Sequence, residues 1–414
     1  MEWQGAQQRQ FWSLQWGGEE VHILLTANSP GEVAGWLAPT VRALSGHQLT
    51  VLIPPCPFAA GTEEAVVQQL PQVSRVLGPG AVKRLFALGW PGKDRPQVLV
   101  FLGGDRQMMA LLARRLGVPA LAYTEGKATG AYRYFCFPDE QSLKRALLSG
   151  LDPRRSLVVG NLMADALAGK ERERENLLLF FAGSRPFQVK LSLGYWLAVA
   201  QKIAETAPEY EMALPLSPFV EREVLLEALA NPRLPGAKAG FLKQEGEKIF
   251  IEAGQTRLLL LDSAQQAGDL PLRYEYMLRA KLAFTLPGTN TMELAAAGTP
   301  QLVVAPTFDL KELPLEGILG LLGRLPLAGR YFSKKAIAKL REDFIALPNR
   351  HAEEMVVPEL AGEILPEEVA HRGLALLDDE GALAEMEEKL RAIAGPPGAG
   401  ARLAQLILKV GKER

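Results

Sequence analysis

Short apolar runs alternate with amphipathic stretches along most of the chain, and this is the pattern of buried strands alternating with helices. Strands that are linked by crossover helices form parallel sheets with helices on both faces. The pattern therefore predicts an α/β protein with two successive sets of parallel strands. The expected strands are residues 21–26, 48–53, 133–137, 211–216, 248–253, 256–262 and 282–286. Residues 177–186 are expected to form a strand that runs into a glycine turn, and residues 97–123 a strand, turn, helix and strand.

Two breaks in this rhythm indicate where the domains meet. The charged segment GKERERENL at residues 169–177 is interpreted as a domain boundary, although a solvated helix end fits the same place. GPPGAGA at residues 395–401 is interpreted as a linker before a last helix, RLAQLILKV. We expect two Rossmann-like, doubly wound domains, residues 1–168 and 169–394, with residues 395–414 as a C-terminal helix that packs back on the first. Ligands bind beyond the carboxyl ends of the strands in such sheets.

Residues 281–306, KLAFTLPGTNTMELAAAGTPQLVVAP, contain the clearest strand, turn and helix. Gly288 is expected to turn the chain, Asn290 to cap the helix, and Glu293 to complete a capping box. The first amides of a helix have no partner within it and lie at its positive end, so they attract phosphate. The alternative is an ordinary βαβ unit in which Glu293 serves only the cap.

Composition excludes several classes of function. The chain has 414 residues, a net charge of −1 and no basic excess, so nucleic acid is not expected as a partner. Cys56 and Cys136 are too few for a disulfide framework, and we expect both to be buried. The four histidines are scattered, so no metal site is predicted. The N-terminus lacks the apolar core of a signal peptide, and no run reaches the roughly 18 apolar residues of a spanning helix. A cytoplasmic protein is expected.

Residues 307–345 interrupt the alternation of strands and helices. The segment is apolar and rich in glycine, and then becomes basic. It either binds lipid as an interfacial segment at the inner face of the cytoplasmic membrane or forms two short helices packed on the protein.

Six segments, in order, resemble the lipid-A-disaccharide synthase family, whose members are GT-B glycosyltransferases. SPGEVAGWLAPTVRAL is similar to the family's first loop and helix, and FLGGDRQMMALLARRLGVPALAY to its strand-and-aspartate unit. LLLFFAGSRPFQV resembles LLLPGSR, and LPGTNTMELAAAGTPQLVV resembles SGTATLE and the small-residue helix after it. VVGNLMADAL is similar to VGHPLAD, with Asn161 at the family's histidine, and FIALPNRHAEEMVVPEL resembles the SLPN and PEL region.

The resemblance implies two GT-B domains that face a cleft. It implies inverting, metal-independent transfer from a UDP-sugar to a lipid or glycolipid acceptor, without a cofactor. The family's C-terminal region is associated with dimers, so a homodimer is expected on this ground alone.

Departure of a diphosphate needs groups that stabilise negative charge. The turn of Gly288, Thr289 and Asn290 can supply amides. Arg185, after the Gly183-Ser184 turn, either binds phosphate through its planar guanidinium or lies on the surface.

Other contacts to the nucleotide follow the resemblance. Glu293 accepts the ribose hydroxyls in GT-B fashion unless it only caps its helix. Ser263 ends a strand near the base or ribose. Asn349 lies near the nucleotide by resemblance, and the alternative is a helix cap.

The acceptor hydroxyl must lose a proton to a base. By resemblance Asp105 is that base and Glu32 is a second polar group, while Ser29, Gly31 and Asn161 line the acceptor side. The alternative for both acids is a first-turn carboxylate that complements the helix dipole. Two other functions stay open: a nucleotide-sugar epimerase or hydrolase, and a binding protein without turnover.

Overall fold

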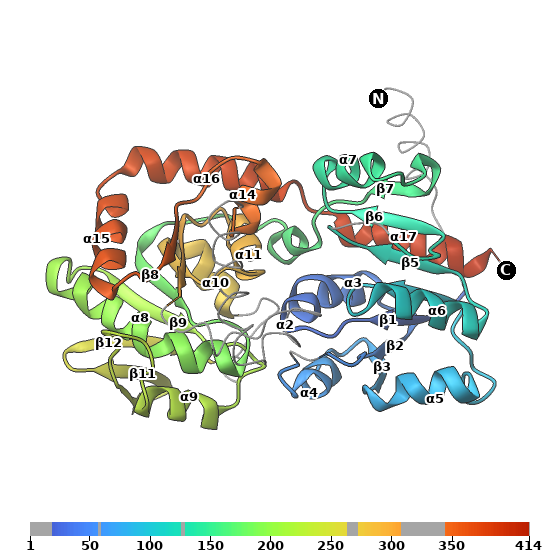
Figure 1. Ribbon diagram of the computed structural model, residues 1–414, viewed down its shortest axis with the longest axis horizontal. Coiled ribbons are helices and arrows are strands. Elements are labelled where there is room, and N and C mark those ends of the chain that lie inside the picture. The colour runs from blue at the N-terminus through green and yellow to red at the C-terminus, as the bar shows by residue number, and fades with distance from the viewer. Residues whose placement is uncertain (1–18, 57–58, 126–128, 263–271, 308–343, 414) are drawn as a thin grey trace, which may run out of the picture. The chain divides into compact units, whose positions relative to one another are not determined.

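The computed structural model describes residues 19–56, 59–125, 129–262, 272–307 and 344–413. The chain divides into two compact units. The first unit consists of residues 1–168 and 395–414, and the second consists of residues 169–394. Each unit is built on one sheet with helices on both of its faces (Figure 1).

The first unit contains a sheet of seven parallel strands in the order β3-β2-β1-β4-β5-β6-β7. The chain winds outward from β1 to β3, and then returns to β4 and winds the other way. The sheet is therefore doubly wound, as the sequence predicts. Its strands are β1 (His22–Thr26), β2 (Gln48–Leu52), β3 (Val73–Leu77), β4 (Val98–Phe101), β5 (Ala120–Tyr123), β6 (Tyr134–Phe137) and β7 (Ser156–Val158).

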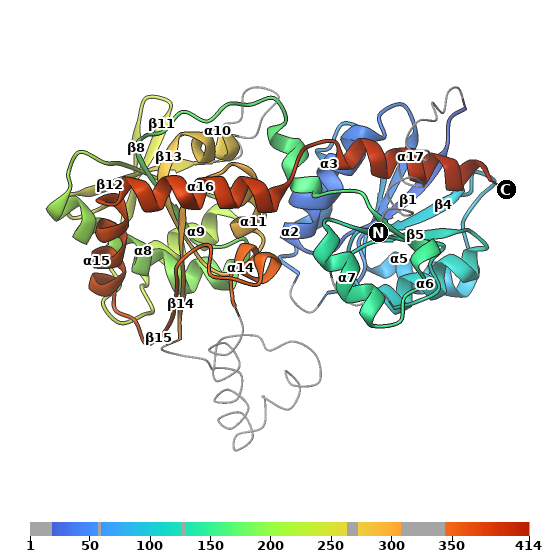
Figure 2. The ribbon, with the colours of Figure 1, turned by 90° about the horizontal axis from the view of Figure 1, so that it is seen from above.

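Helices cover the first sheet on two sides. The C-terminal helix α17 lies beside α3 on one side, and α5, α6 and α7 lie on the other (Figure 2). The strongly amphipathic α17 buries its apolar stripe against this unit, as a surface helix must. The helices are α2 (Pro30–Glu32), α3 (Ala38–Ala43), α4 (Glu63–Gln68), α5 (Gly80–Leu88), α6 (Arg106–Leu116), α7 (Glu140–Leu148) and α17 (Ala399–Lys412), with 3-10 helices η2 (Pro153–Arg155) and η3 (Leu162–Leu167).

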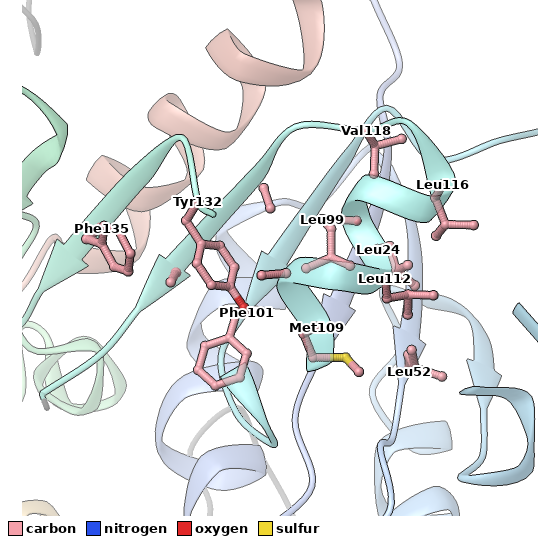
Figure 3. Packing of buried hydrophobic residues seen from close by; sticks show 14 of the residues in the cluster. Leu24, Leu52, Leu99, Phe101, Met109, Leu112, Leu116, Val118, Tyr132 and Phe135 are labelled. Carbon is pink, nitrogen blue, oxygen red and sulfur yellow. The ribbon is translucent and has the colours of Figure 1, made fainter. Parts of the chain in front are cut away.

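The core of the first unit lies between β1, β4 and α6. Figure 3 shows Met109 and Leu112 of α6 beside Leu24 and Leu99 of the strands. All four side chains are fully buried, so each strand residue is covered on its helix side. Gly117 ends α6 in the left-handed conformation that glycine readily adopts. Cys136 is buried as predicted, but Cys56 is only half-buried.

The helix after β1 contains one wide turn. The sequence predicts a kink at Pro39 or a helix start near Trp36. Instead α2 begins at Pro30, a π-helix η1 (Val33–Leu37) follows it, and α3 continues the same rod. The amide of Ala38 reaches back to the carbonyl of Val33, five residues earlier. A proline cannot donate to the turn before it, and widening the turn accommodates the missing donor without a break.

The second unit contains an eight-stranded sheet in the order β10-β11-β12-β9-β8-β13-β14-β15. All its pairs are parallel except for the antiparallel meander of β10, β11 and β12. The expected strands are present, but the edge is not purely parallel. The strands are β8 (Glu175–Phe181), β9 (Glu211–Pro215), β10 (Phe241–Glu245), β11 (Lys248–Ala253), β12 (Thr256–Leu261), β13 (Ala280–Thr285), β14 (Gln301–Pro306) and β15 (Glu359–Gly362).

Two groups of helices cover the second sheet. Helix α8 packs against α9 and α15, while α11 packs against α14 and α16. Beneath α8, Phe180 and Phe284 stack with centroids 4.8 Å apart, and Trp196 is fully buried beside them. The helices are α8 (Pro186–Thr206), α9 (Arg222–Ala230), α10 (Leu272–Arg279), α11 (Asn290–Ala296), α14 (Leu347–Ala352), α15 (Pro366–Leu377) and α16 (Glu380–Ala394).

The charged segment at residues 169–177 is not simply solvated. Arg172 is 1% exposed, and its Nη2 donates to the carbonyl of Ala280 at 2.6 Å. Its Nε donates to Glu387 at 3.1 Å. Burial lowers the pKa of Arg172 to about 10, against the pull of Glu387, so the side chain still carries its charge at neutral pH. The segment fastens the start of the second unit to helix α16.

Candidate functional site

Each sheet has one point where the direction of winding reverses. In the first sheet this point lies between β1 and β4, and in the second it lies between β8 and β13. The helices after the two strands of each pair leave in opposite directions, so the strand ends stay uncovered. This is where ligands bind in doubly wound sheets.

Glu32 is the last residue of the short helix α2, which follows β1. Its Oε2 accepts hydrogen bonds from the amides of Asn28 at 3.0 Å and Ser29 at 3.1 Å, and Oγ of Ser29 accepts from the amide of Glu32. Ser29 and Glu32 thus form a capping box around Pro30 and Gly31. The dipole-complementing alternative for Glu32 is observed.

The same carboxylate also touches the loop after β4. A Cβ at Gly103 would lie 1.9 Å from Oε2 of Glu32, so a larger residue there would displace this carboxylate. Burial raises the pKa of Glu32, although the backbone amides of Asn28, Ser29 and Gly104 act in the opposite direction. A carboxylate with a raised pKa at a strand end is a candidate general base.

Asp105 follows Gly104, whose φ is +102°. Oδ1 of Asp105 accepts from the amide of Met108 at 2.8 Å and caps α6. The residue is exposed, and no residue in the described ranges donates to its Oδ2. Asp105 and Glu32 therefore follow the two neighbouring strands of one reversal point, one carboxylate open to solvent and one enclosed.

Asn161 follows β7 and caps η3. Its Oδ1 accepts from the amide of Met163 at 3.0 Å, while its buried Nδ2 has no acceptor among the described residues. Tyr123 lies next to it: its hydroxyl donates to the carbonyl of Gly160 at 3.2 Å, and its ring packs edge-on against Trp36. The buried Nε1 of Trp36 also lacks an acceptor among these residues. Sequence reasoning missed Trp36, and the sequence gives no signal for it.

The Gly183 turn follows β8. Gly183 has a φ of +99°, and Oε1 of Gln188 accepts from the amides of Ser184 at 3.0 Å and Arg185 at 3.1 Å. The sequence analysis missed Gln188. Its signal was visible, because Gln188 follows Arg185 by three residues, the spacing of a capping box, in a helix that starts with Pro186. These two amides are occupied and cannot bind an anion. Ser184 also carries a hydroxyl on this turn, and Arg185 carries a guanidinium.

The second turn follows β13, the strand beside β8. Gly288 has a φ of +150°, and no described residue accepts from the amides of Gly288, Thr289 or Asn290. The prediction that Asn290 caps the helix is wrong. The helix begins at Asn290, its N-cap is Thr289, and no side chain caps it. Because Phe181 and Thr285 are paired in register, this turn and the Gly183 turn both follow the carboxyl ends of neighbouring strands, at the same end of the sheet.

The predicted capping box of Glu293 is also wrong. Its Oε1 accepts from Nη2 of Arg273 and from the hydroxyl of Tyr274, both at 2.9 Å. Both partners lie on α10, outside the helix that Glu293 was expected to cap. Glu293 is almost fully buried at the start of α11, at the same strand end as Gly288.

Asn349 has no free polar atom. It is fully buried, its Nδ2 donates to the carbonyl of Val357 and to Glu359, and its Oδ1 accepts from the amides of Val356 and Val357. It does not cap α14, whose N-cap is Ala346. Its role is to fasten α14 to the segment before β15. Ser263 and most of residues 307–345 lie outside the described residues.

The described residues contain no group of three or more histidine, cysteine, aspartate or glutamate side chains that could hold a metal ion. None of their helices combines the length and the apolar character needed to cross a membrane.

Comparison with known proteins identifies the fold. No family model and no curated protein matches the chain. A solved protein of Listeria monocytogenes, assigned as a UDP-N-acetylglucosamine 2-epimerase, matches with a TM-score of 0.56 and 16% identity over 93% of this chain and 95% of its own. MnaA of S. aureus, solved with UDP, matches with a TM-score of 0.55 and 12% identity over the same shares.

A glycosyltransferase is among the matches as well. CalG4, the calicheamicin glycosyltransferase, has a TM-score of 0.51 and 14% identity over 95% of this chain and 98% of its own. At such identities the likeness concerns the fold alone, and it extends over nearly the whole chain. The two Rossmann-like units of this protein together have the GT-B fold.

Proposed function

We propose that the protein is an inverting, metal-independent glycosyltransferase that moves a sugar from a UDP-sugar to a lipid-linked or other hydrophobic acceptor. The observation that carries the proposal is the chemistry at the two reversal points. An enclosed carboxylate, Glu32, and an open one, Asp105, follow the strands of the first. A turn that bears Arg185 and a turn with unbonded amides follow the strands of the second.

The second unit binds the donor. As the bond to the sugar breaks, negative charge grows on the diphosphate, and donors fixed in advance stabilise it. The guanidinium of Arg185 supplies a planar pair of donors, and the amides of Gly288, Thr289 and Asn290 supply more. The hydroxyl of Ser184, beside Gly183, adds a neutral donor. Glu293 accepts hydrogen bonds from the ribose.

The first unit supplies the base for the acceptor. Asp105 takes the proton from the attacking hydroxyl, and Glu32 holds the loops after β1 and β4 together beside it. Ser29, Gly31 and Asn161 line the acceptor side. The unbonded Nδ2 of Asn161 offers a donor to an oxygen of the acceptor.

The nature of the acceptor rests on the resemblance to lipid-A-disaccharide synthases and on the apolar, then basic, sequence of residues 307–345. Such a composition suits contact with a membrane surface from the cytoplasmic side. A homodimer through the C-terminal region rests on the resemblance only.

An epimerase acting on a UDP-sugar is the second candidate. The structural match to the Listeria protein favours it, and two carboxylates at one reversal point could remove and return a proton on the sugar. Both candidates use the same donor site, and they differ in whether an acceptor is needed.

Incubation with UDP-sugars labelled in the sugar, with and without a lipid extract, separates the two. Release of UDP that depends on the extract, with label moving into the lipid phase, is the expected result. A change in the sugar without the extract would instead establish the epimerase. Binding of UDP without any turnover would leave a binding protein and contradict both.

A further inference from the structure

Glu293 is held by hydrogen bonds from two residues of α10, Arg273 and Tyr274. Nη2 of Arg273 carries two hydrogens: one is donated to Oε1 of Glu293 at 2.9 Å, and the other to the hydroxyl of Tyr274 at 3.0 Å. The Tyr274 hydroxyl then donates its own hydrogen to Oε1 at 2.9 Å. Two donors in this triad, Nη2 of Arg273 and the hydroxyl of Tyr274, therefore meet at one carboxylate oxygen of Glu293.

Packing and charge fix the triad. The guanidinium of Arg273 lies 4.7 Å from the ring centre of Tyr274, and Tyr274 and Glu293 are both buried. Burial opposes the charge of Arg273, but Glu293 and Tyr274 outweigh it and raise its pKa. Burial raises the pKa of Tyr274 to about 12, so its hydroxyl stays a donor at neutral pH.

The other carboxylate oxygen is unused. No residue in the described ranges donates to Oε2 of Glu293. Glu293 lies in the first turn of α11, directly after the strand end where the second sheet reverses. A carboxylate there repels phosphate and accepts hydrogen bonds, so its natural partners are hydroxyl groups.

We propose that Arg273 and Tyr274 are positioning residues that aim Oε2 of Glu293 at the ribose hydroxyls of the nucleotide, and that the triad makes the site select ribonucleotides over deoxyribonucleotides. The inference rests on the proposed donor site in the second unit. A fixed carboxylate discriminates because loss of its hydroxyl partner leaves a desolvated carboxylate oxygen without a hydrogen bond. A carboxylate free to rotate would turn to water and lose this preference.

Calorimetry with UDP, 2′-deoxy-UDP and 3′-deoxy-UDP tests the proposal. The unaltered protein should bind UDP roughly tenfold to a hundredfold more tightly than at least one of the deoxy ligands, as expected for one hydrogen bond to a charged group. Arg273→Ala should weaken UDP binding and leave the affinity for that deoxy ligand nearly unchanged, so the ratio falls towards one. Arg273→Lys keeps the positive charge but loses the planar guanidinium, so it should restore only part of the ratio of UDP affinity to deoxy-UDP affinity.

Tyr274→Phe provides a milder variant should Arg273→Ala fail to fold. It removes one donor to Glu293 and keeps the ring beneath the guanidinium, so an intermediate ratio is expected. Arg279→Ala is the matched control, because Arg279 lies on the same helix but pairs with Glu175 at the surface at 2.7 Å, and it should behave as the unaltered protein.

The possible results distinguish the role of Arg273 and Tyr274 from the existence of the donor site. Equal weakening of UDP and deoxy-UDP in the Arg273 and Tyr274 variants would show a merely structural role and overturn the inference while leaving the donor site intact. A lack of UDP binding by the unaltered protein would overturn the proposed function, and this inference with it.

Discussion

The carboxylate of Asp165 accepts a hydrogen bond from the amide of Gly400 at 2.6 Å, across 235 residues of sequence. It also accepts hydrogen bonds from the amides of Gly398 and Ala399, so one carboxylate binds three successive backbone donors at the start of α17. These donors have no partner within the helix, and the helix dipole favours negative charge there. Asp165 thus joins the C-terminal helix to the loop after β7 within the first unit.

Replacement of Asp165 by alanine should therefore loosen α17. Loss of these charge-assisted bonds should lower the free energy of unfolding by about 2–3 kcal/mol and the Tm of the first unit by several degrees. Urea and thermal unfolding measure the effect, and proteolysis near residues 395–398 should accelerate. Asp152→Ala is the control, because Asp152 caps only the exposed η2. Equal stability of the two variants would contradict the assigned role.

Gly103→Ala should disable the first unit's reversal point without unfolding it. A Cβ there would meet Oε2 of Glu32 at 1.9 Å, so the carboxylate must leave its amides. Transfer should fall at least as far as in Glu32→Gln, while UDP affinity, which belongs to the second unit, stays unchanged. Gly80→Ala is the matched control because its Cβ would meet nothing within 4 Å. Full activity of Gly103→Ala would show that the enclosure of Glu32 is irrelevant.

Stability should depend on pH through Glu32. Burial raises its folded pKa above the ordinary 4.5, so the folded state holds the proton more tightly than the unfolded state. Between the unfolded and folded pKa values, stability therefore falls as pH rises. Glu32→Gln removes this term, so the stability of the variant relative to the unaltered protein should increase from pH 4 to pH 7. Urea unfolding across that range measures it, and parallel curves would contradict the raised pKa.

Much of the fold was predictable because buried parallel strands are apolar over their whole length. The run at residues 282–286, for example, predicts β13 (Ala280–Thr285) within two residues. The antiparallel edge was not predicted, because the alternation in β11 (Lys248–Ala253) does not show which neighbour it pairs with. Arg172 was missed for a similar reason: its charge indicates solvent, and only the carbonyls of distant residues explain its burial.

The candidate site divides in the same way. Glycine turns at strand ends are local, so the Gly183 and Gly288 turns were found from sequence. Side-chain partners are not local. Glu293 has the spacing of a capping box, yet Arg273 and Tyr274, about 20 residues earlier, take its oxygen instead. Gln188 shows the reverse case, because its signal was local and visible and yet was overlooked.

Asp105→Ser should separate capping from catalysis. Serine is a good N-cap, so α6 should keep its first turn and the free energy of unfolding should change by less than about 1 kcal/mol. The carboxylate is lost, however, and transfer should fall at least a hundredfold, in line with removal of a general base. Calorimetry should show unchanged UDP affinity. Weakened UDP binding with turnover preserved would contradict Asp105 as the base.

Arg185→Lys should weaken binding of UDP at least tenfold, because lysine keeps the charge but loses the planar pair of donors that suits a diphosphate. Uridine, which lacks phosphate, should bind both proteins equally, so the loss is assigned to the diphosphate and not to a damaged turn. Gln188→Ala tests the turn itself: it frees the amides of Ser184 and Arg185, and both ligands should weaken together if the turn loosens. Arg257→Lys, on the β11–β12 edge, is the control for an exchange of arginine far from the turns. Should UDP and uridine lose affinity in parallel in Arg185→Lys, the guanidinium would be a structural group and the diphosphate would have to be bound by the Gly288 turn alone.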